Sequence, residues 1–218
     1  MCGIIAAASN RNVGELLVEG LHKMEYRGYD SAGLALHQEK NIAHLRTLGK
    51  VSLLEEKLKL TNPSSTLGIA HTRWATHGEP SEKNAHPHKS NERIYIVHNG
   101  IIENHLELKS FLVNQGYQFI SETDSEVIGH LLDYFLSQGS NILDAIYLTK
   151  EKLDGAYAIA ILDIEDDENI YIARNKAPLL IGKGDKENFA ASDPLAVGKL
   201  ANEFIFLEDG DVAVISKK

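Results

Sequence analysis

Residues 156–162 read Ala-Tyr-Ala-Ile-Ala-Ile-Leu, an apolar run of the length expected for one β-strand. Because both sides of such a strand are apolar, both of its faces need to be covered by other parts of the protein. Further strand-like segments follow one another along the chain with short turns between them, which favours antiparallel sheets. Two stacked antiparallel sheets with helices against their outer faces meet both requirements. Taken alone, the hydrophobic periodicity predicts an α+β fold.

Apolar residues at helical or strand spacing account for most of the remaining chain. The predicted helices are 13–24, 52–60, 104–112, 127–135 and 142–153, and the predicted strands are 3–8, 34–37, 42–48, 67–74, 94–98, 156–163, 170–173, 179–181, 188–190, 203–207 and 212–216. The polar segment 76–93 is expected to be a loop. Thr123 and Glu126 fit the capping-box pattern, which would place Asp124 in the first turn of the helix that follows.

The composition restricts the class of protein. The chain has 218 residues, of which 43% are hydrophobic, enough for a single large domain spanning residues 1–218. Its formal net charge of −9 argues against nucleic-acid binding. No stretch approaches the roughly 18 consecutive apolar residues of a membrane-spanning helix. The single cysteine excludes an internal disulfide bond, which fits a reducing, cytoplasmic environment. We therefore expect a cytoplasmic domain that binds neither nucleic acid nor membranes.

That single cysteine, Cys2, directly follows Met1. If Met1 is removed, Cys2 carries both a thiol, with an ordinary pKa of about 8.5, and an α-amine, with a pKa of about 8. One residue then supplies a nucleophile and its own proton acceptor. A lone cysteine is more often a small, buried and unreactive side chain. Its position alone does not decide between the two interpretations.

Six ordered blocks of sequence carry more specific information. They are Cys2-Gly3-Ile4, EYRGYDSAG at 25–33, HTRWATHGEP at 71–80, NAHPH at 84–88, VHNGIIEN at 97–104 and FIFLEDGD at 204–211. Together they resemble the glutaminase domain of the glutamine–fructose-6-phosphate aminotransferase (isomerizing) family, which belongs to the class II glutamine amidotransferases. The resemblance spans essentially the whole chain.

The resemblance implies a fold and a reaction. The fold would be the four-layer αββα sandwich of the N-terminal-nucleophile hydrolases. Cys2 would attack the side-chain amide of L-glutamine, and its α-amine would relay the proton to the departing ammonia. Water would then hydrolyse the γ-glutamyl thioester to L-glutamate. In the full-length enzymes of this family, sugar-isomerase domains use the ammonia to convert fructose 6-phosphate to glucosamine 6-phosphate. Those domains are expected to be missing from this chain, the full-length enzyme is expected to be a homo-oligomer, and no cofactor is expected.

Asn99 and Gly100 match the family's oxyanion hole. Attack on a carboxamide builds negative charge on the carbonyl oxygen, so donors must be in place there. A side-chain amide and an adjacent backbone N–H would supply two. Asn-Gly is also the strongest short signal for a hairpin turn, and composition alone favours the turn. The two interpretations are compatible.

Further residues match the family's glutamine-binding positions. Arg73 matches the clamp for the α-carboxylate, which suits the two-pronged guanidinium. Asp124 matches the acceptor of the α-ammonium. Thr76 and His77 match the pocket lining on a loop, 73–81, that closes over glutamine, and Trp74 matches the gate through which ammonia leaves. Three of these residues have a plainer alternative: a surface ion pair for Arg73, a favourable acid at a helix start for Asp124 and a core anchor for Trp74.

Arg27 matches a family position close to the nucleophile and is expected to support the chain terminus. His71, His77, His86 and His88 suggest zinc, but they lack the spacing of a zinc motif, and no metal is expected.

Two alternative functions remain. One is the glutaminase domain of another amidotransferase, such as amidophosphoribosyltransferase, although the blocks at 26–30 and 73–77 favour the hexosamine enzyme. The other is a noncatalytic glutamine-binding module whose N-terminus is blocked. The mass of the intact chain would distinguish the second, because a free amine on Cys2 requires the loss of Met1.

Overall fold

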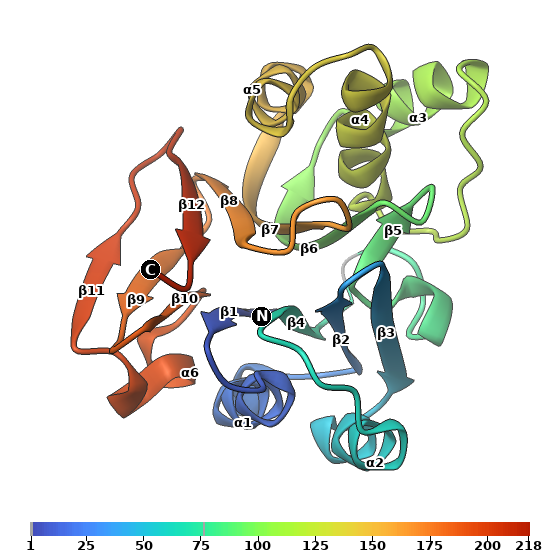
Figure 1. Ribbon diagram of the computed structural model, residues 1–218. Coiled ribbons are helices and arrows are strands. Elements are labelled where there is room, and N and C mark those ends of the chain that lie inside the picture. Colours follow the sequence, from blue (N-terminus) through green and yellow to red (C-terminus); the bar gives the residue numbers. More distant parts are fainter. Residues whose placement is uncertain (1, 76) are drawn as a thin grey trace.

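The chain folds into four layers, helix–sheet–sheet–helix, in a computed structural model that describes residues 2–75 and 77–218 (Figure 1). The predicted αββα sandwich is therefore confirmed. Every pairing between the named strands of the described residues is antiparallel. No helix among these residues is both long and apolar enough to cross a membrane.

The first sheet brings together strands from the two ends of the chain. Its order is β11 (Glu203–Phe206), β9 (Leu180–Lys183), β10 (Glu187–Ala191), β1 (Gly3–Ser9), β4 (Leu67–Arg73), β2 (Ser31–Gln38) and β3 (Asn41–Leu48). The second sheet is built from the middle of the chain and a C-terminal strand. Its order is β12 (Val212–Ser216), β8 (Asn169–Asn175), β7 (Gly155–Asp163), β6 (Ile94–Ile102) and β5 (His88–Ser90).

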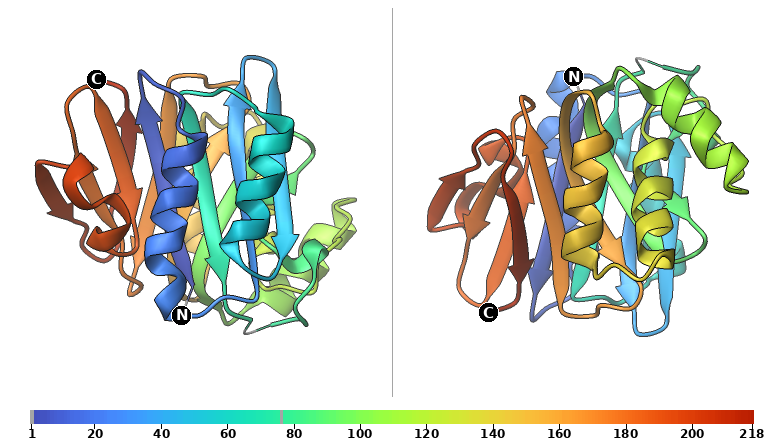
Figure 2. Two further views of the ribbon diagram at one scale, coloured as in Figure 1. Left: turned by 90° about the horizontal axis from the view of Figure 1, so that it is seen from below. Right: turned by 90° about the horizontal axis from the view of Figure 1, so that it is seen from above.

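Helices cover the outer face of each sheet (Figure 2). The first sheet carries α1 (Gly14–Met24), α2 (Val51–Thr61) and the short α6 (Pro194–Val197), while α4 (Glu126–Ser137) and α5 (Ile142–Lys152) lie on the second sheet with α3 (His105–Asn114) beside α4. Local signals fix their ends. The residue that follows α2, Asn62, adopts a left-handed conformation (φ 43°) that terminates the helix, and Asn141 caps α5 by accepting a hydrogen bond from the Asp144 N–H at 2.9 Å.

The apolar run 156–162 lies in β7 and is covered on both faces, as predicted. Ala158, Ala160 and Leu162 pack between the two sheets, whereas Ile159 and Ile161 pack under the helices of the second sheet. β1 alternates in the same way, with Ile4, Ala6 and Ala8 in the layer between the sheets. This inter-sheet layer is rich in alanine, because Ala35 and Ala190 also belong to it.

The segment 76–93, expected to be a loop, contains the strand β5, which pairs with β6. Two predictions from local sequence motifs are also wrong. Asn99-Gly100 does not form a hairpin turn: it lies inside β6, which stays paired with β7 as far as Ile102 opposite Gly155. The capping box at 123–126 does not form either. The α4 helix begins at Glu126, so Asp124 lies before it, and the Glu126 carboxylate accepts hydrogen bonds from the backbone N–H groups of residues 120 and 121. In both cases contacts distant in sequence override the local signal.

The packing of the first sheet against its helices can be tested with two phenylalanines. Phe189 on β10 is fully buried beneath the helices, whereas Phe206 on β11 is 69% exposed. Phe189→Ala should lower the free energy of unfolding by about 3–5 kcal/mol, because it opens a cavity in a packed core. Phe206→Ala, the matched control, should change it by less than about 0.5 kcal/mol. Urea denaturation measures both, and equal effects would contradict the layer assignment.

Candidate active site

The candidate site lies at one end of the sandwich, where strands of both sheets meet. Cys2 directly precedes β1, whose first residue pairs with Thr72 near the end of β4. Asn99 and Gly100 lie on β6 of the opposite sheet. The antiparallel pairing thus brings the start of β1 beside the end of β4, and sheet stacking brings β6 over both.

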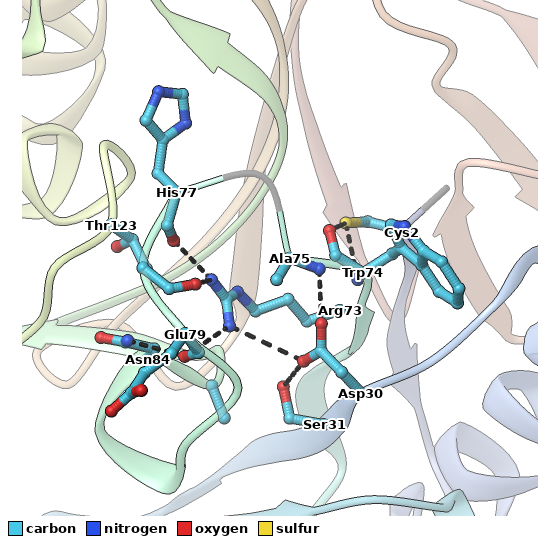
Figure 3. A network of polar contacts seen from close by, with 12 residues as sticks. Cys2, Asp30, Ser31, Arg73, Trp74, Ala75, His77, Glu79, Asn84 and Thr123 are labelled. Carbon is cyan, nitrogen blue, oxygen red and sulfur yellow. Dashed lines mark hydrogen bonds and ion pairs between the residues drawn. The ribbon is translucent and has the colours of Figure 1, made fainter.

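The thiol of Cys2 is held by the backbone that follows β4. Its Sγ accepts a hydrogen bond from the N–H of Trp74 at 3.2 Å (Figure 3). Burial raises the pKa of the Cys2 thiol above its ordinary value, although the Trp74 N–H, which favours the thiolate, opposes that shift. The resting group is therefore a neutral thiol, and nucleophilic attack needs a base to take its proton.

Asn99 and Gly100 approach Cys2 from the second sheet. The Nδ2 of Asn99 donates to the backbone oxygen of Cys2 at 3.3 Å, so an amide donor lies beside the nucleophilic residue. Gly100 has a φ of 133°, and a Cβ at this position would come within 1.9 Å of the Ala156 carbonyl oxygen. Only glycine fits here, which explains the Asn-Gly pair without a turn.

A narrow pocket of about 20 Å³ opens next to Cys2. Its walls include Asp124, His77 and Gly100. The Asp124 carboxylate is buried, accepts a hydrogen bond from the Ile102 N–H at 2.8 Å through Oδ2, and lies 3.8 Å from the His77 ring through Oδ1. A space of this size holds about one water molecule, so an amino acid enters only if the pocket widens.

Arg73 is buried among backbone carbonyl groups of the loop 77–79, so the surface ion-pair interpretation is wrong. One terminal nitrogen donates to the carbonyl oxygens of His77 at 2.5 Å and Gly78 at 2.9 Å, and the guanidinium lies 3.6 Å from the Asp30 carboxylate (Figure 3). In this structure Arg73 therefore holds the loop in place. Its binding of a substrate carboxylate stays a prediction.

Two further residues that hold this loop were not identified from the sequence. The Asp30 carboxylate accepts a hydrogen bond from the Ala75 N–H, and its backbone N–H donates to the Arg73 carbonyl at 2.7 Å. Asn84, also buried, donates to the Glu79 carbonyl at 2.9 Å and accepts from the Glu122 N–H at 2.9 Å. Asp30 belongs to the sequence block 25–33, but no local pattern in that block indicates that Asp30 contacts a segment far along the chain. Thr76 lies outside the described residues.

Trp74 is 53% exposed, so it is not a core anchor. Its ring lies against Gly28, where a φ of 99° and an ideal Cβ position 2.3 Å from the indole both require glycine. Trp74 lines both the narrow pocket and a wider one of about 610 Å³, which is also lined by Cys2, Ile101 and Pro178.

Arg27 supports the start of β1 indirectly. Its guanidinium donates to the carbonyl oxygen of Ser192 at 3.4 Å and lies 3.6 Å from the Asp193 carboxylate. The Ser192 hydroxyl in turn accepts a hydrogen bond from the Ile4 N–H at 3.0 Å. The supporting role expected for Arg27 is consistent with this chain of contacts.

Three of the histidines considered for zinc form a buried column. The ring centroids of His71 and His86 are 4.1 Å apart, and those of His86 and His88 are 4.4 Å apart. Burial lowers the pKa values of His71 and His88 to about 3 and that of His86 well below its ordinary value, so all three are neutral. Within residues 2–75 and 77–218, no group of three or more His, Cys, Asp or Glu side chains is arranged to hold a metal ion.

Comparison with known proteins assigns this site to a family. Residues 71–198, more than half of the chain, match the family model of the glutamine amidotransferase domain. The chain belongs to the glutamine amidotransferase family. It is 52% identical to the glutamine–fructose-6-phosphate aminotransferase [isomerizing] of Photorhabdus laumondii and 49% identical to that of Haemophilus influenzae. Both alignments cover 100% of this chain but 36% of the relative, so the chain spans about a third of the length of these proteins.

Solved structures show the same architecture for this amidotransferase domain. The glutamine phosphoribosylpyrophosphate amidotransferase of B. subtilis superposes with a TM-score of 0.86 at 25% identity, over 99% of this chain and 47% of that one. A class-II glutamine aminotransferase domain protein from Silicibacter pomeroyi shares the fold, with a TM-score of 0.63 at 15% identity over 99% of this chain and 95% of that one. The four layers are those of the N-terminal-nucleophile hydrolase fold.

The buried histidines predict a pH-dependent stability. Their folded-state pKa values lie below the ordinary value of about 6.5, so between pH 7 and pH 5 the unfolded chain takes up protons that the folded chain does not. The free energy of unfolding should therefore fall on acidification, by about 2 kcal/mol per histidine over this interval. Urea titrations at both pH values measure it. In His71→Gln, the decrease in the free energy of unfolding between pH 7 and pH 5 should be smaller by the contribution of one histidine. A decrease as large as that of the wild type would contradict the burial argument.

Proposed function

We propose that this domain hydrolyses L-glutamine to L-glutamate and ammonia, with Cys2 as the nucleophile. The proposal rests on the observation that three reactive or polar groups from different parts of the fold lie close to one another at Cys2. The Cys2 thiol, just before β1, and the Asp124 carboxylate, from the segment before α4, lie at one small pocket, and the Asn99 amide from β6 bonds the backbone oxygen of Cys2. The thiol would attack the side-chain amide of glutamine, the Asn99 amide would stabilise the oxyanion that forms, and the Asp124 carboxylate would bind the α-ammonium.

The reaction follows from these groups. The free α-amine of Cys2 takes the thiol proton, and the sulfur attacks the amide carbon to form a C–S bond. The Asn99 amide and the Gly100 N–H stabilise the resulting oxyanion. When the C–N bond breaks, the proton passes from the Cys2 ammonium to the leaving nitrogen, and ammonia departs. Water then attacks the thioester, releasing glutamate and restoring the thiol.

We assign substrate recognition to the narrow pocket. The Oδ1 of Asp124 lies 3.8 Å from the His77 ring, and a substrate ammonium that reaches this carboxylate would gain a charged hydrogen bond. Arg73 would bind the α-carboxylate by exchanging its bonds to loop carbonyls for bonds to the substrate, with Thr76 and His77 beside it. Since the pocket is too small for glutamine as it stands, loop 73–81 must shift to admit it.

The length of the relatives supports a role in a larger enzyme. We propose that in the whole protein the ammonia passes beyond Trp74 to sugar-isomerase domains, where it converts fructose 6-phosphate to glucosamine 6-phosphate. Residues 1–218 would then form the single glutaminase domain of that enzyme. The chain is about 50% identical to the aminotransferases but only 25% identical to the phosphoribosylpyrophosphate amidotransferase. This difference favours glucosamine 6-phosphate as the product over that of an amidophosphoribosyltransferase.

The nucleophile can be tested directly, using protein whose mass shows that Met1 has been removed. The domain should release glutamate and ammonia from glutamine in equal amounts. Cys2→Ala should abolish this activity because no other thiol exists in the sequence, while its circular dichroism spectrum stays that of the wild type. Turnover by the alanine variant would reject the mechanism. Absence of turnover by the processed wild type would favour a noncatalytic binding module.

Recognition of the ammonium can be tested with Asp124→Asn, which keeps an oxygen for the Ile102 N–H but removes the charge. The kcat/KM for glutamine should fall by about 2 kcal/mol, or about 30-fold, the scale of a charged hydrogen bond. The variant should also lose its preference for glutamine over glutaramic acid, which has no α-amine. Asp133→Asn is the matched control, because this buried acid bonds the Tyr117 hydroxyl away from the pocket. If Asp124→Asn still prefers glutamine over glutaramic acid, Asp124 does not bind the ammonium and its role is structural.

A further inference from the structure

One buried side chain crosses from the first sheet to the second beside the nucleophile. His71, on β4, is 1% exposed, and its Nε2 lies 3.0 Å from the backbone oxygen of His98 and 3.0 Å from the Oδ1 of Asn99. It is not among the described residues that line either pocket at Cys2. Its direct contact with the proposed oxyanion donors is the hydrogen bond to Asn99.

The hydrogen bonds fix the protonation of this imidazole. A backbone carbonyl oxygen can only accept a hydrogen bond, so the Nε2 that faces the His98 oxygen must carry a hydrogen. Burial lowers the pKa of His71 to about 3, so the ring is neutral and its Nδ1 has no hydrogen. One tautomer, with the hydrogen on Nε2, satisfies both conditions.

That tautomer selects one orientation of the Asn99 amide. The amide group is nearly symmetric in shape, and rotation about its last bond is soft, so packing alone discriminates poorly between its two orientations. If the amide turned over, its NH2 group would face the Nε2–H, and two donors would oppose each other in a buried site. The oxygen must therefore face His71. The Nδ2 then points to the other side, where it lies 3.3 Å from the Cys2 backbone oxygen.

We propose that His71 is a positioning residue that locks the Asn99 amide with its NH2 group facing the reacting carbonyl. The proposal rests on the function assigned above, because the donor matters only if an oxyanion forms at Cys2. Oxyanion stabilisation is gained in the transition state rather than in the bound substrate, so loss of the lock lowers kcat and leaves KM nearly unchanged. Mispositioning of this donor should cost at least 30-fold in kcat, within reach of the roughly 10²–10³-fold effect of removing an oxyanion donor altogether.

Three variants separate positioning from packing. His71→Leu fills the site but offers no donor, and its kcat should fall at least 30-fold. His71→Gln places an amide N–H close to where Nε2 lies, so its kcat should remain within about threefold of the wild type. His37→Leu is the matched control: His37 is another buried histidine whose Nε2 bonds a backbone oxygen, that of Ile164 at 3.0 Å, and it lies at the far end of β2 from Asp30. Its kcat should be unchanged.

A double-mutant cycle supplies a readout that a merely structural role would not move. If His71 acts through Asn99, then His71→Leu in an Asn99→Ala background should lower kcat by less than twofold further. If the fold losses in kcat of the two single variants multiply in the double variant, or if His71→Leu keeps the wild-type kcat, the proposal is overturned. Either result would leave the glutaminase function intact.

The wild-type protein provides a test that does not depend on folding of the variants or on turnover. Nitrogen-15 NMR of the histidine rings at pH 7 should show His71 protonated at Nε2 and bare at Nδ1. A hydrogen on Nδ1 would overturn the proposal. If the wild type shows this tautomer but does not hydrolyse glutamine, the proposed function fails on its own, and the geometric lock stands.

Discussion

The close packing of the two sheets is the constraint on which the site depends. The layer between them is rich in alanine, with Ala6 and Ala8 on β1 and Ala158 and Ala160 on β7. Small side chains allow the sheets to approach, so a side chain on one sheet can hydrogen-bond to groups on the other, as His71 does with residues of β6. The thiol belongs to the first sheet and the oxyanion donors to the second. Larger residues in this layer would separate them, and neither sheet alone carries a complete site.

A second constraint governs access to the pocket. The loop after β4 is held by two side chains: Arg73 donates to its carbonyl groups, and the Asp30 carboxylate accepts from the Ala75 N–H. These bonds shape a pocket with room for about one water molecule. They are polar and few, which makes them the kind of contact that can be exchanged for a substrate's own charged groups. A site that closes around glutamine also keeps ammonia from being lost to water.

The sequence predicted the elements of this fold well because most of them rest on local periodicity. The strand at 156–162 and the helix at 13–24 needed nothing beyond the spacing of their apolar residues. The family resemblance then brought Cys2, Asn99 and Asp124 together in one hypothesis. In the structure Cys2 lines two pockets, with Asp124 in the wall of the narrow one and Asn99 in the wall of the wider one.

What the sequence could not predict depends on contacts between distant residues. Asp30 bonds a backbone group 45 positions later, and His71 bonds Asn99 28 positions later, and no local pattern marks either pair. The same cause produced the two wrong predictions. Asn99-Gly100 is a strong turn signal locally, but continued pairing with β7 keeps it in a strand. Thr123 and Glu126 fit a capping box, but Thr123 bonds His88 and Glu126 bonds the chain ahead of the helix.

The central claim is that Cys2 attacks a carbonyl whose oxygen is received by Asn99 and Gly100. The most direct measurement is a crystal structure of the processed domain alkylated at Cys2 by a glutamine analogue in which an electrophilic ketone replaces the carboxamide. The account predicts that the adduct's oxygen lies about 3 Å from both the Asn99 Nδ2 and the Gly100 nitrogen, with the Asn99 Oδ1 still facing His71. An adduct whose oxygen points to solvent, with the Asn99 amide turned away from it, would contradict the account.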